Sequence, residues 1–251
     1  MSEHVYGSHR FIYRPAVTSV DRQMIYQLRY QVYVNEWRFE NRLDHPSGME
    51  RDVFDQHSHH FMAFSNDILI GTVRIIRNSP IGFPLERNCT VTADLSALNR
   101  ERIGEISRLA VSKDFRRRAY DKELYEGGPV SEELFLSDKD VRRKRHEIIL
   151  GLFKAMYQES RMLGITHWIV ATARALQILL RRLGIFFEPI GPEVNYHGLR
   201  TPYLICISDI ESHLAETNRE LLEEFIDGLP EELKPAFIAG RKTEEDRSLP
   251  Q

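Results

Sequence analysis

Residues 103–112 read IGEISRLAVS, and apolar side chains stand at both odd and even positions of this run. A strand with one buried face alternates apolar and polar residues, whereas a strand buried on both faces carries apolar residues at both parities. The run therefore predicts a central strand of a covered sheet. It also contains Glu105, Ser107 and Arg108. Strict alternation would place Glu105 and Arg108 on opposite faces, where each needs its own partner.

The segments on either side of this strand predict an α/β fold. Two apolar runs over 59–65 and 68–76, separated by Asn66 and Asp67, predict a β-hairpin. Apolar periodicity and turn residues predict the remaining elements: a strand at 11–14, a helix from about 21 to 35, a helix opened at Ser137 and ended at Gly164, a strand at 166–172, a helix at 174–183, and strands at 185–190 and 202–208. This order favours a mixed sheet with a parallel crossover over 103–172.

The composition predicts one domain and excludes some functions. We expect the domain to cover 1–213, with a polar insertion at 113–140 and an acidic appendage at 214–251. The formal net charge of −3 disfavours nucleic-acid binding. No apolar run approaches the roughly 20 residues of a membrane helix. The N-terminus lacks the apolar stretch of a secretory signal, which predicts a cytoplasmic protein with reduced thiols at Cys89 and Cys206.

Several charged residues outside the central strand are candidates for a site. Arg29 and Tyr33 lie four apart on one face of the first predicted helix, which a surface arginine over a core tyrosine would also explain. Asp52 and Asp55 end the long loop 36–58; they could pair with Arg74, bind a cationic substrate, or form a solvated acidic turn. For Glu105 and Arg108 the structural alternative is two separate buried ion pairs. The histidines at 57, 59 and 60 lack further ligands at metal spacing, so we predict no metal.

These residues form an ordered set along the chain. The set is Arg29 and Tyr33; Trp37 or Phe39; Asp52 and Asp55; Gly71 and Arg74; and Glu105, Ser107 and Arg108. Over residues 11–210 it resembles the acyl-homoserine-lactone (autoinducer) synthases and the long-chain N-acyl amino acid synthases. It is most similar to the acyltransferase associated with PEP-CTERM/exosortase systems. The resemblance implies a GNAT-like fold, an acyl carrier protein as acyl donor, and attack by a substrate amine.

Two departures from related patterns refine this expectation. Tyr33 stands where autoinducer synthases usually carry Phe, which favours an amino acid over S-adenosylmethionine as acceptor. Ordinary acetyltransferases bind the coenzyme A pyrophosphate on a Gly-rich loop after the central strand, but here 113–118 contains no glycine. We therefore expect the acyl donor to be a carrier-protein thioester rather than free coenzyme A. We also expect no cofactor. A basic cluster is the predicted docking patch for an acidic carrier protein, or else a solvated basic face: Arg116, Arg117, Arg118, Arg142, Arg143 and Arg145.

The predicted mechanism assigns roles to these residues. Glu105, with a pKa raised by burial, is the candidate general base, and Ser107 and Arg108 complete the catalytic set. Backbone N–H groups near Val111 would stabilise the oxyanion. The predicted acceptor site comprises Arg29, Tyr33, Trp37, Asp52, Asp55 and Arg74. The acyl chain is expected beside the strand at 167–172. The alternatives are homoserine-lactone synthesis from S-adenosylmethionine and a non-catalytic module that binds an acyl or nucleotide ligand.

Overall fold

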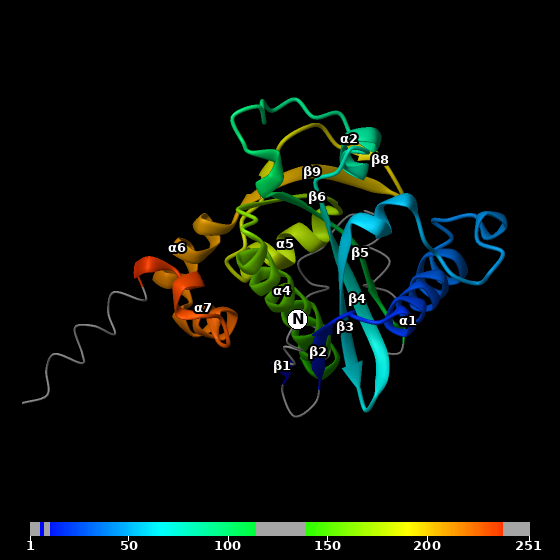
Figure 1. The fold of residues 1–251 in the computed structure, drawn as a ribbon, viewed down its shortest axis with the longest axis horizontal. Coiled ribbons are helices and arrows are strands. Elements are labelled where there is room, and N and C mark those ends of the chain that lie inside the picture. The colour runs from blue at the N-terminus through cyan, green and yellow to red at the C-terminus, as the bar shows by residue number, and fades with distance from the viewer. Residues whose placement is uncertain (1–5, 8–10, 114–138, 238–251) are drawn as a thin grey trace, which may run out of the picture.

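The computed structural model describes residues 6–7, 11–113 and 139–237. For residues 6–7 and 139–145 it describes the backbone alone. Among these residues a twisted sheet forms the centre of the molecule (Figure 1). Its strands follow the order β1-β2-β3-β4-β5-β6-β9-β7, with β8 paired separately to β9. The strands are β1 Tyr6–Gly7, β2 Ile12–Pro15, β3 Ser58–Ser65, β4 Ile68–Arg77, β5 Ile103–Val111, β6 His167–Thr172, β7 Glu188–Pro189, β8 Val194–Asn195 and β9 Leu199–Cys206.

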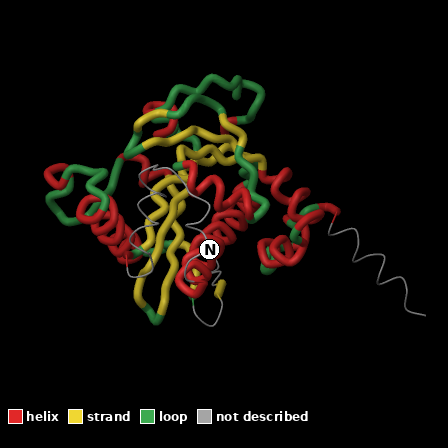
Figure 2. Tube along the Cα trace, turned by 180° about the vertical axis from the view of Figure 1, so that it is seen from behind, coloured by secondary structure: helices red, strands yellow, loops and turns green. Residues whose placement is uncertain are grey.

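Helices cover both faces of the sheet (Figures 1 and 2). They are α1 Ser19–Arg29, which continues as a π-helix over Tyr30–Glu36, α2 Pro84–Asn88, α4 Lys139–Leu163, α5 Arg174–Arg182, α6 Ile207–Thr217 and α7 Arg219–Ile226. On one face, α1 and the π-helix pack against β3 to β5. On the other face, α4 to α7 share one core with side chains from the sheet. The GNAT-like mixed sheet flanked by helices is thus confirmed.

Two elements form as their sequences predict. Asn66 and Asp67 both adopt positive φ, 47° and 63°, as the two-residue turn between β3 and β4 requires. In α4, the predicted apolar stripe lies against the sheet and is buried: Ile148, Ile149, Leu152, Phe153 and Met156. Gly164 ends this helix with φ 71°, a conformation that costs glycine little.

The strands β5 and β6 separate in the middle of the sheet. They are its parallel pair among the described strands, and they pair only where Ile103–Glu105 faces His167–Ile169. Beyond Glu105, β5 continues beside β4 and β6 continues beside β9. A gap therefore opens between two strands at the centre of the sheet, and it begins at Glu105.

A β-bulge interrupts β5 at Arg108. Thr72 pairs with Ala110 and Arg74 pairs with Ser107, so two residues of β5 lie opposite Val73. Arg108 has φ 53°, an uncommon value for a non-glycine residue, and the bulge provides for it. The extra residue breaks the alternation, so the prediction that Glu105 and Arg108 lie on opposite faces is wrong; both line one cavity.

Elsewhere in the chain, several observed elements differ from the predicted ones. The segment 79–101 contains α2, a helix that the sequence analysis did not predict, and the strand predicted at 185–190 is reduced to β7. The predicted strand 202–208 ends at Cys206, where α6 begins. The segment predicted as an appendage contributes to the main core up to residue 229: Leu214, Leu221, Leu222, Phe225, Ile226 and Leu229. The insertion predicted at 113–140 lies almost entirely outside the described residues.

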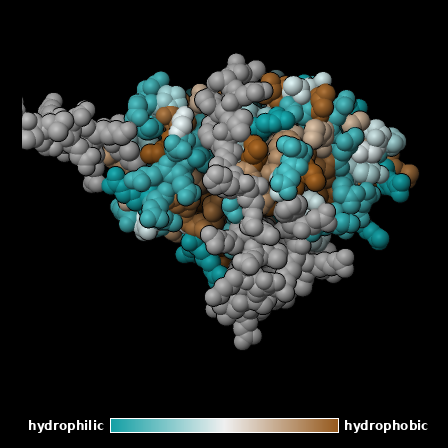
Figure 3. Space-filling view, turned by 90° about the horizontal axis from the view of Figure 1, so that it is seen from below, coloured by the Kyte–Doolittle hydropathy of each residue, from teal (hydrophilic) through white to brown (hydrophobic). Residues whose placement is uncertain are grey.

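Seen from below, the described surface is mostly hydrophilic, with apolar side chains showing in the middle of this face (Figure 3). No helix in the described ranges combines the length and the apolar character that a membrane crossing requires.

Candidate active site

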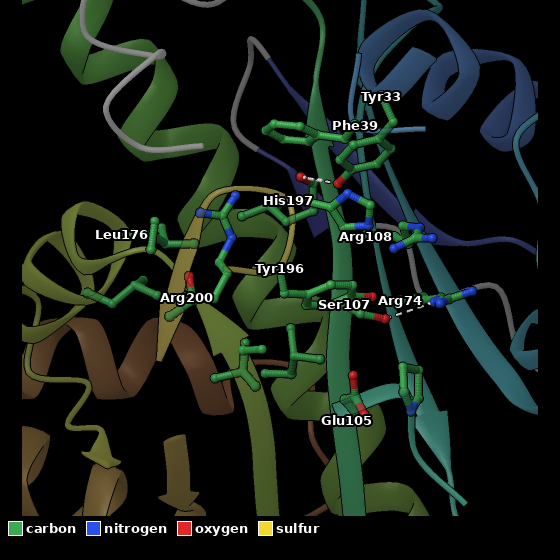
Figure 4. Close-up of a pocket in the computed structure, with 18 of the residues that line it drawn as sticks. Tyr33, Phe39, Arg74, Glu105, Ser107, Arg108, Leu176, Tyr196, His197 and Arg200 are labelled. Atoms are coloured by element: carbon green, nitrogen blue, oxygen red, sulfur yellow. Dashed lines mark hydrogen bonds between the residues drawn. The ribbon is translucent and has the colours of Figure 1, made fainter. Parts of the chain in front are cut away.

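A cavity occupies the gap between β5 and β6 (Figure 4). Its walls come from β5, from the last residues of β6, from α5, and from the loops around Phe39 and His197. One wall is apolar and includes Phe153, Val170, Ala171, Leu176, Leu180 and Phe187. The other is polar and includes Arg74, Glu105, Ser107, Arg108, Tyr196, His197 and Arg200. The cavity thus joins an apolar compartment to a charged one.

Glu105 lies in the polar wall at the point where the two strands part. Its side chain is buried, with 3% of the residue exposed. Its Oε2 accepts a hydrogen bond from the Leu85 N–H of α2 at 2.9 Å. Burial raises the pKa of Glu105 to about 8, against the opposing effects of that N–H and of Arg74. Among the ion pairs of the described residues Glu105 takes part in none, so the ion-pair alternative does not apply to it.

Three arginines in and behind the polar wall share a network of carboxylates. Arg29 donates to Glu50 and, at 2.7 Å, to Asp55. Arg74 donates Nη1 and Nη2 to Asp52 at 2.7 and 2.8 Å, and Nε to the Ser107 hydroxyl at 2.8 Å. Arg108 donates Nε to Glu50 at 3.1 Å and Nη2 to Glu40 at 2.9 Å. The network links α1, the loop 40–57, β4 and β5.

The electrostatics of the network keep its inner carboxylates ionised. Burial alone would raise the pKa of Glu50, but Arg29 and Arg108 outweigh it and hold that pKa at about 2. Burial would also raise the pKa of Asp55, but Arg29 and Arg74 outweigh it and lower that pKa to about 2. Glu40, nearer the cavity, has a raised pKa because burial outweighs Arg108. These ion pairs therefore fix the polar wall in one arrangement across the neutral pH range.

Some of the predicted acceptor residues line the cavity, and others lie behind its polar wall. Tyr33 and Arg74 line the cavity, and the Tyr33 hydroxyl donates to the Leu109 carbonyl at 2.8 Å (Figure 4). Arg29 and Asp55 are buried, at 0% and 8% exposure, and lie behind that wall. Asp52 bridges Arg74 and Arg108. Arg29 and Asp55 therefore support the site and do not line it.

Of the predicted pair Trp37 or Phe39, only Phe39 is among the residues that line the cavity. Trp37 stacks on the outer side of Phe39 with the ring centroids 6.0 Å apart. Of the predicted catalytic set, Glu105, Ser107 and Arg108 all line the cavity. Val111, near which the oxyanion donors were predicted, does not line the cavity. The part of β5 that lines the cavity beyond Glu105 is residues 106–109.

Sequence reasoning missed the contribution of the loop between β8 and β9 and of the first residues of β9. Tyr196, His197 and Arg200 complete the cavity wall. His197 packs against Phe39 with ring centroids 5.6 Å apart, and its Nε2 lies 3.5 Å from Glu40. Burial, then Arg108 and Arg200, lower the pKa of His197 to about 4. The positive φ of His197 and Gly198 marks a tight turn, but nothing local in the sequence indicates that the turn reaches β5.

The basic cluster that was predicted to dock a carrier protein stays a prediction. Arg116, Arg117 and Arg118 lie outside the described residues, and the side chains of Arg142, Arg143 and Arg145 do as well. In the described ranges, no group of three or more His, Cys, Asp or Glu residues is arranged to hold a metal ion.

Comparison with known proteins shows the fold of the chain and its general activity. Residues 28–126 match the acetyltransferase (GNAT) domain family. That range contains the network, the bulge and Glu105. The chain has the GNAT fold and is an acyltransferase.

The chain is also similar to acyl-homoserine-lactone synthases and to an N-acyl amino acid synthase. An acyl-homoserine-lactone synthase from Vibrio anguillarum is 23% identical over 214 residues, which are 84% of this chain and 96% of the relative. FeeM, an N-acyl amino acid synthase from uncultured soil microbes, superposes with a TM-score of 0.54 at 16% identity, over 82% of this chain and 96% of FeeM. BjaI, a coenzyme A-dependent acyl-homoserine lactone synthase, superposes with a TM-score of 0.53 at 19% identity, over 83% and 82%. The predicted resemblance to acyl-homoserine-lactone synthases and N-acyl amino acid synthases is confirmed. The association with PEP-CTERM/exosortase systems stays a prediction.

Proposed function

We propose that this GNAT-fold acyltransferase moves a fatty acyl group from an acyl carrier protein to the amine of a small acceptor, most simply an amino acid. The observation that carries the proposal is the position of Glu105. Its carboxyl group has a pKa of about 8 and lies in the polar wall of the cavity, where β5 and β6 part. A group that can hold or release a proton near neutral pH suits general base catalysis.

The proposed reaction is a single displacement at the thioester. The acceptor nitrogen attacks the thioester carbonyl carbon and forms the C–N bond, while the Glu105 carboxylate takes a proton from that nitrogen. The carbonyl oxygen becomes an oxyanion, for which backbone N–H groups at the splayed edge of β5 are the candidate donors. As the intermediate collapses, the C–S bond breaks, the thiolate leaves, and the proton on Glu105 passes to sulfur or solvent.

The two walls of the cavity suit the two parts of such a substrate. The acyl chain would lie along Val170, Ala171, Leu176 and Leu180, beside the strand where the sequence analysis expected it. Each methylene removed from water there contributes about 0.8 kcal/mol. The acceptor would lie on the polar side, against Tyr33 and Phe39.

The choice of donor rests on the sequence after β5. Residues 113–118 read KDFRRR and offer no glycine for a backbone nest around a pyrophosphate. This favours a carrier-protein thioester, whereas the coenzyme A dependence of BjaI makes coenzyme A the alternative donor.

The choice of acceptor rests on the neighbours and on Tyr33. FeeM, an N-acyl amino acid synthase, supports an amino acid, and BjaI, whose structure holds S-adenosylmethionine, supports S-adenosylmethionine as the alternative. The Tyr33 hydroxyl is fixed on the Leu109 carbonyl and makes this side of the cavity more polar than a phenylalanine would.

The test is an acyl-transfer assay with the full chain. We would incubate the protein with acyl carrier protein or coenzyme A thioesters of several chain lengths, together with each standard amino acid or S-adenosylmethionine. Mass spectrometry of the products should show an N-acyl amino acid formed from the carrier-protein thioester. An acyl-homoserine lactone would establish the alternative acceptor, faster transfer from coenzyme A would overturn the donor, and the absence of any amide product would overturn the function.

A further inference from the structure

The apolar side of the cavity ends inside the main core, along β6. Trp168, Val170 and Thr172 alternate in this strand and therefore share one of its faces. Val170 and Thr172 line the cavity, whereas Trp168 does not. Trp168 is fully buried in the main core. The cavity thus runs along β6 from Thr172 towards Trp168 and stops before it reaches the indole ring.

Phe153 of α4 closes the cavity at this end. Of the α4 side chains that the structure describes, it is the one that lines the cavity. Phe153 is 2% exposed, and its ring meets that of Trp168 edge-on, with the centroids 6.3 Å apart. Leu180, beside it in the lining, is 1% exposed, whereas Leu176 (Figure 4) and Phe187 are partly exposed. The apolar wall is therefore closed at Phe153 and open towards Leu176.

The ring of Phe153 is supported from behind. Trp168 packs on it from β6, and the indole Nε1–H of Trp168 donates to the Ser160 hydroxyl of α4 at 2.9 Å. Trp168 and Ser160 are both 0% exposed, so the indole cannot turn aside without leaving a buried hydrogen bond unmade. Protein interiors are close-packed and leave few voids into which a ring could shift. Phe153 is therefore a fixed obstacle at the end of the apolar wall.

We propose that Phe153 sets the maximum length of the acyl chain that this protein transfers. The inference rests on the proposed N-acyltransferase function, and it applies to a carrier-protein or a coenzyme A donor, since either would deliver the chain to the same wall. With the thioester carbonyl beside Glu105, the chain extends along this wall until its terminal methyl group meets the Phe153 ring. Each methylene up to that point raises the affinity about fourfold through burial. Longer chains must displace the ring or fold back, and they lose this gain.

The experiment compares thioesters that differ only in chain length. Carrier-protein and coenzyme A thioesters of even-numbered saturated chains are assayed with the acceptor found in the acyl-transfer assay, and kcat/KM for the donor is plotted against length. The wild type should show an upper limit. In Phe153→Ala this limit should move to chains about two to four carbons longer, because the space left by the ring accommodates further methylenes. For a chain two carbons beyond the wild-type limit, kcat/KM relative to the chain at the limit should rise by roughly 10- to 20-fold.

Phe225→Ala is the matched control. Phe225 is also 2% exposed and also packs against an aromatic ring, that of Tyr157, with the centroids 5.5 Å apart, but it does not line the cavity. Its removal should leave the length limit unchanged. Ratios between chain lengths do not depend on the amount of folded enzyme, which protects the test against a partly folded variant. If Phe153→Ala does not fold, Phe153→Leu keeps an apolar side chain there and should move the limit by about two carbons.

A limit that stays in place in an active Phe153 variant, or that moves equally in Phe225→Ala, would overturn the inference. A wild type that transfers chains of every length equally well would overturn it too. Failure of every thioester to react would instead overturn the proposed function, and calorimetry with saturated fatty acids would then test the inference alone. The affinity should stop rising at a shorter chain in the wild type than in Phe153→Ala; the same cut-off in both proteins, or no binding, would contradict the role of Phe153.

Discussion

Arg29 neutralises buried acids and does not reach the substrate cavity. Its side chain is fully buried, and its donors bind Glu50 and Asp55, which belong to the loop 40–57. The same carboxylates bind Arg108 and Arg74 on the sheet. Arg29 therefore holds α1, the loop and the polar wall of the cavity in one arrangement, and its part in activity is indirect.

Replacing Arg29 by Ala should destabilise the protein strongly, because Glu50 and Asp55 would stay buried beside one cation fewer. Removing one partner of a buried ion pair typically costs about 3–5 kcal/mol. Urea unfolding at pH 7, followed by circular dichroism, would measure the change. Arg219→Ala is the control: Arg219 pairs with Glu223 at 2.9 Å with both side chains about half exposed, and the loss should stay below about 1 kcal/mol. Similar losses in the two variants would contradict the structural role of Arg29.

Residue identity indicates charge but not geometry. The resemblance grouped Glu105, Arg108, Asp52, Asp55 and Arg74 into one predicted site, although the strand pattern alone separated Glu105 from Arg108. It could not show which carboxylate each arginine binds, because the pairing depends on a bulge that places a non-glycine residue at positive φ. A strand pattern assumes regular alternation and so misplaces every residue beyond such a bulge.

At the scale of elements, α4 lies close to β2 because of one glycine. A Cβ built on Gly151 would come within 2.1 Å of the Tyr13 ring. The Tyr13 hydroxyl donates to the Glu147 carbonyl of the same helix at 2.9 Å. The ring thus occupies the space that a side chain at position 151 would need.

Gly151→Ala should destabilise the protein by about 1–3 kcal/mol, the usual cost of overpacking, even though alanine favours helix by about 1 kcal/mol. The sign should reverse in a Tyr13→Leu background, where the ring is gone and the helix propensity of alanine remains. Thermal unfolding of the four proteins in this double-mutant cycle would measure the coupling. A destabilisation of equal size in both backgrounds would show that the close packing is not the cause.

Long, periodic elements were predictable, and short ones were not. The β3–β4 hairpin and α4 have strong local signals, namely a two-residue turn and an apolar stripe over several turns. The helix α2 has five residues, too few for a periodic pattern, yet its Leu85 N–H binds Glu105. Cavity residues Tyr196, His197 and Arg200 come from a distant turn whose position depends on the pairing of β9 with β6.

At the scale of the whole molecule, the C-terminal helices belong to the core. The side chains of Leu214, Leu222 and Phe225 are at most 2% exposed. Gln158 of α4 donates to the carbonyls of Phe225 and Asp227 at 2.9 and 2.6 Å. Acidic residues gave this segment the composition of an appendage, but its apolar residues recur on one face of α7 and cover α4.

Truncation after residue 213 should therefore abolish cooperative unfolding or yield insoluble protein, because the apolar face of α4 would be exposed. Truncation after residue 237 removes none of the described core and should leave the melting temperature within a few degrees. Differential scanning calorimetry of both truncated proteins would distinguish these outcomes. A stable, cooperative protein ending at residue 213 would show that α6 and α7 are dispensable.

The proton-accepting role of Glu105 is the central claim, and the pH dependence of kcat/KM for the acyl donor tests it most directly. The pKa of Glu105 is raised to about 8, so the carboxyl is protonated and inactive as a base at lower pH. At saturating acceptor, kcat/KM should rise with pH and level off above an apparent pKa of about 8. In Glu105→Gln the value should fall by roughly 10²- to 10⁴-fold and lose that inflection. A variant that keeps both the rate and the inflection would contradict the account.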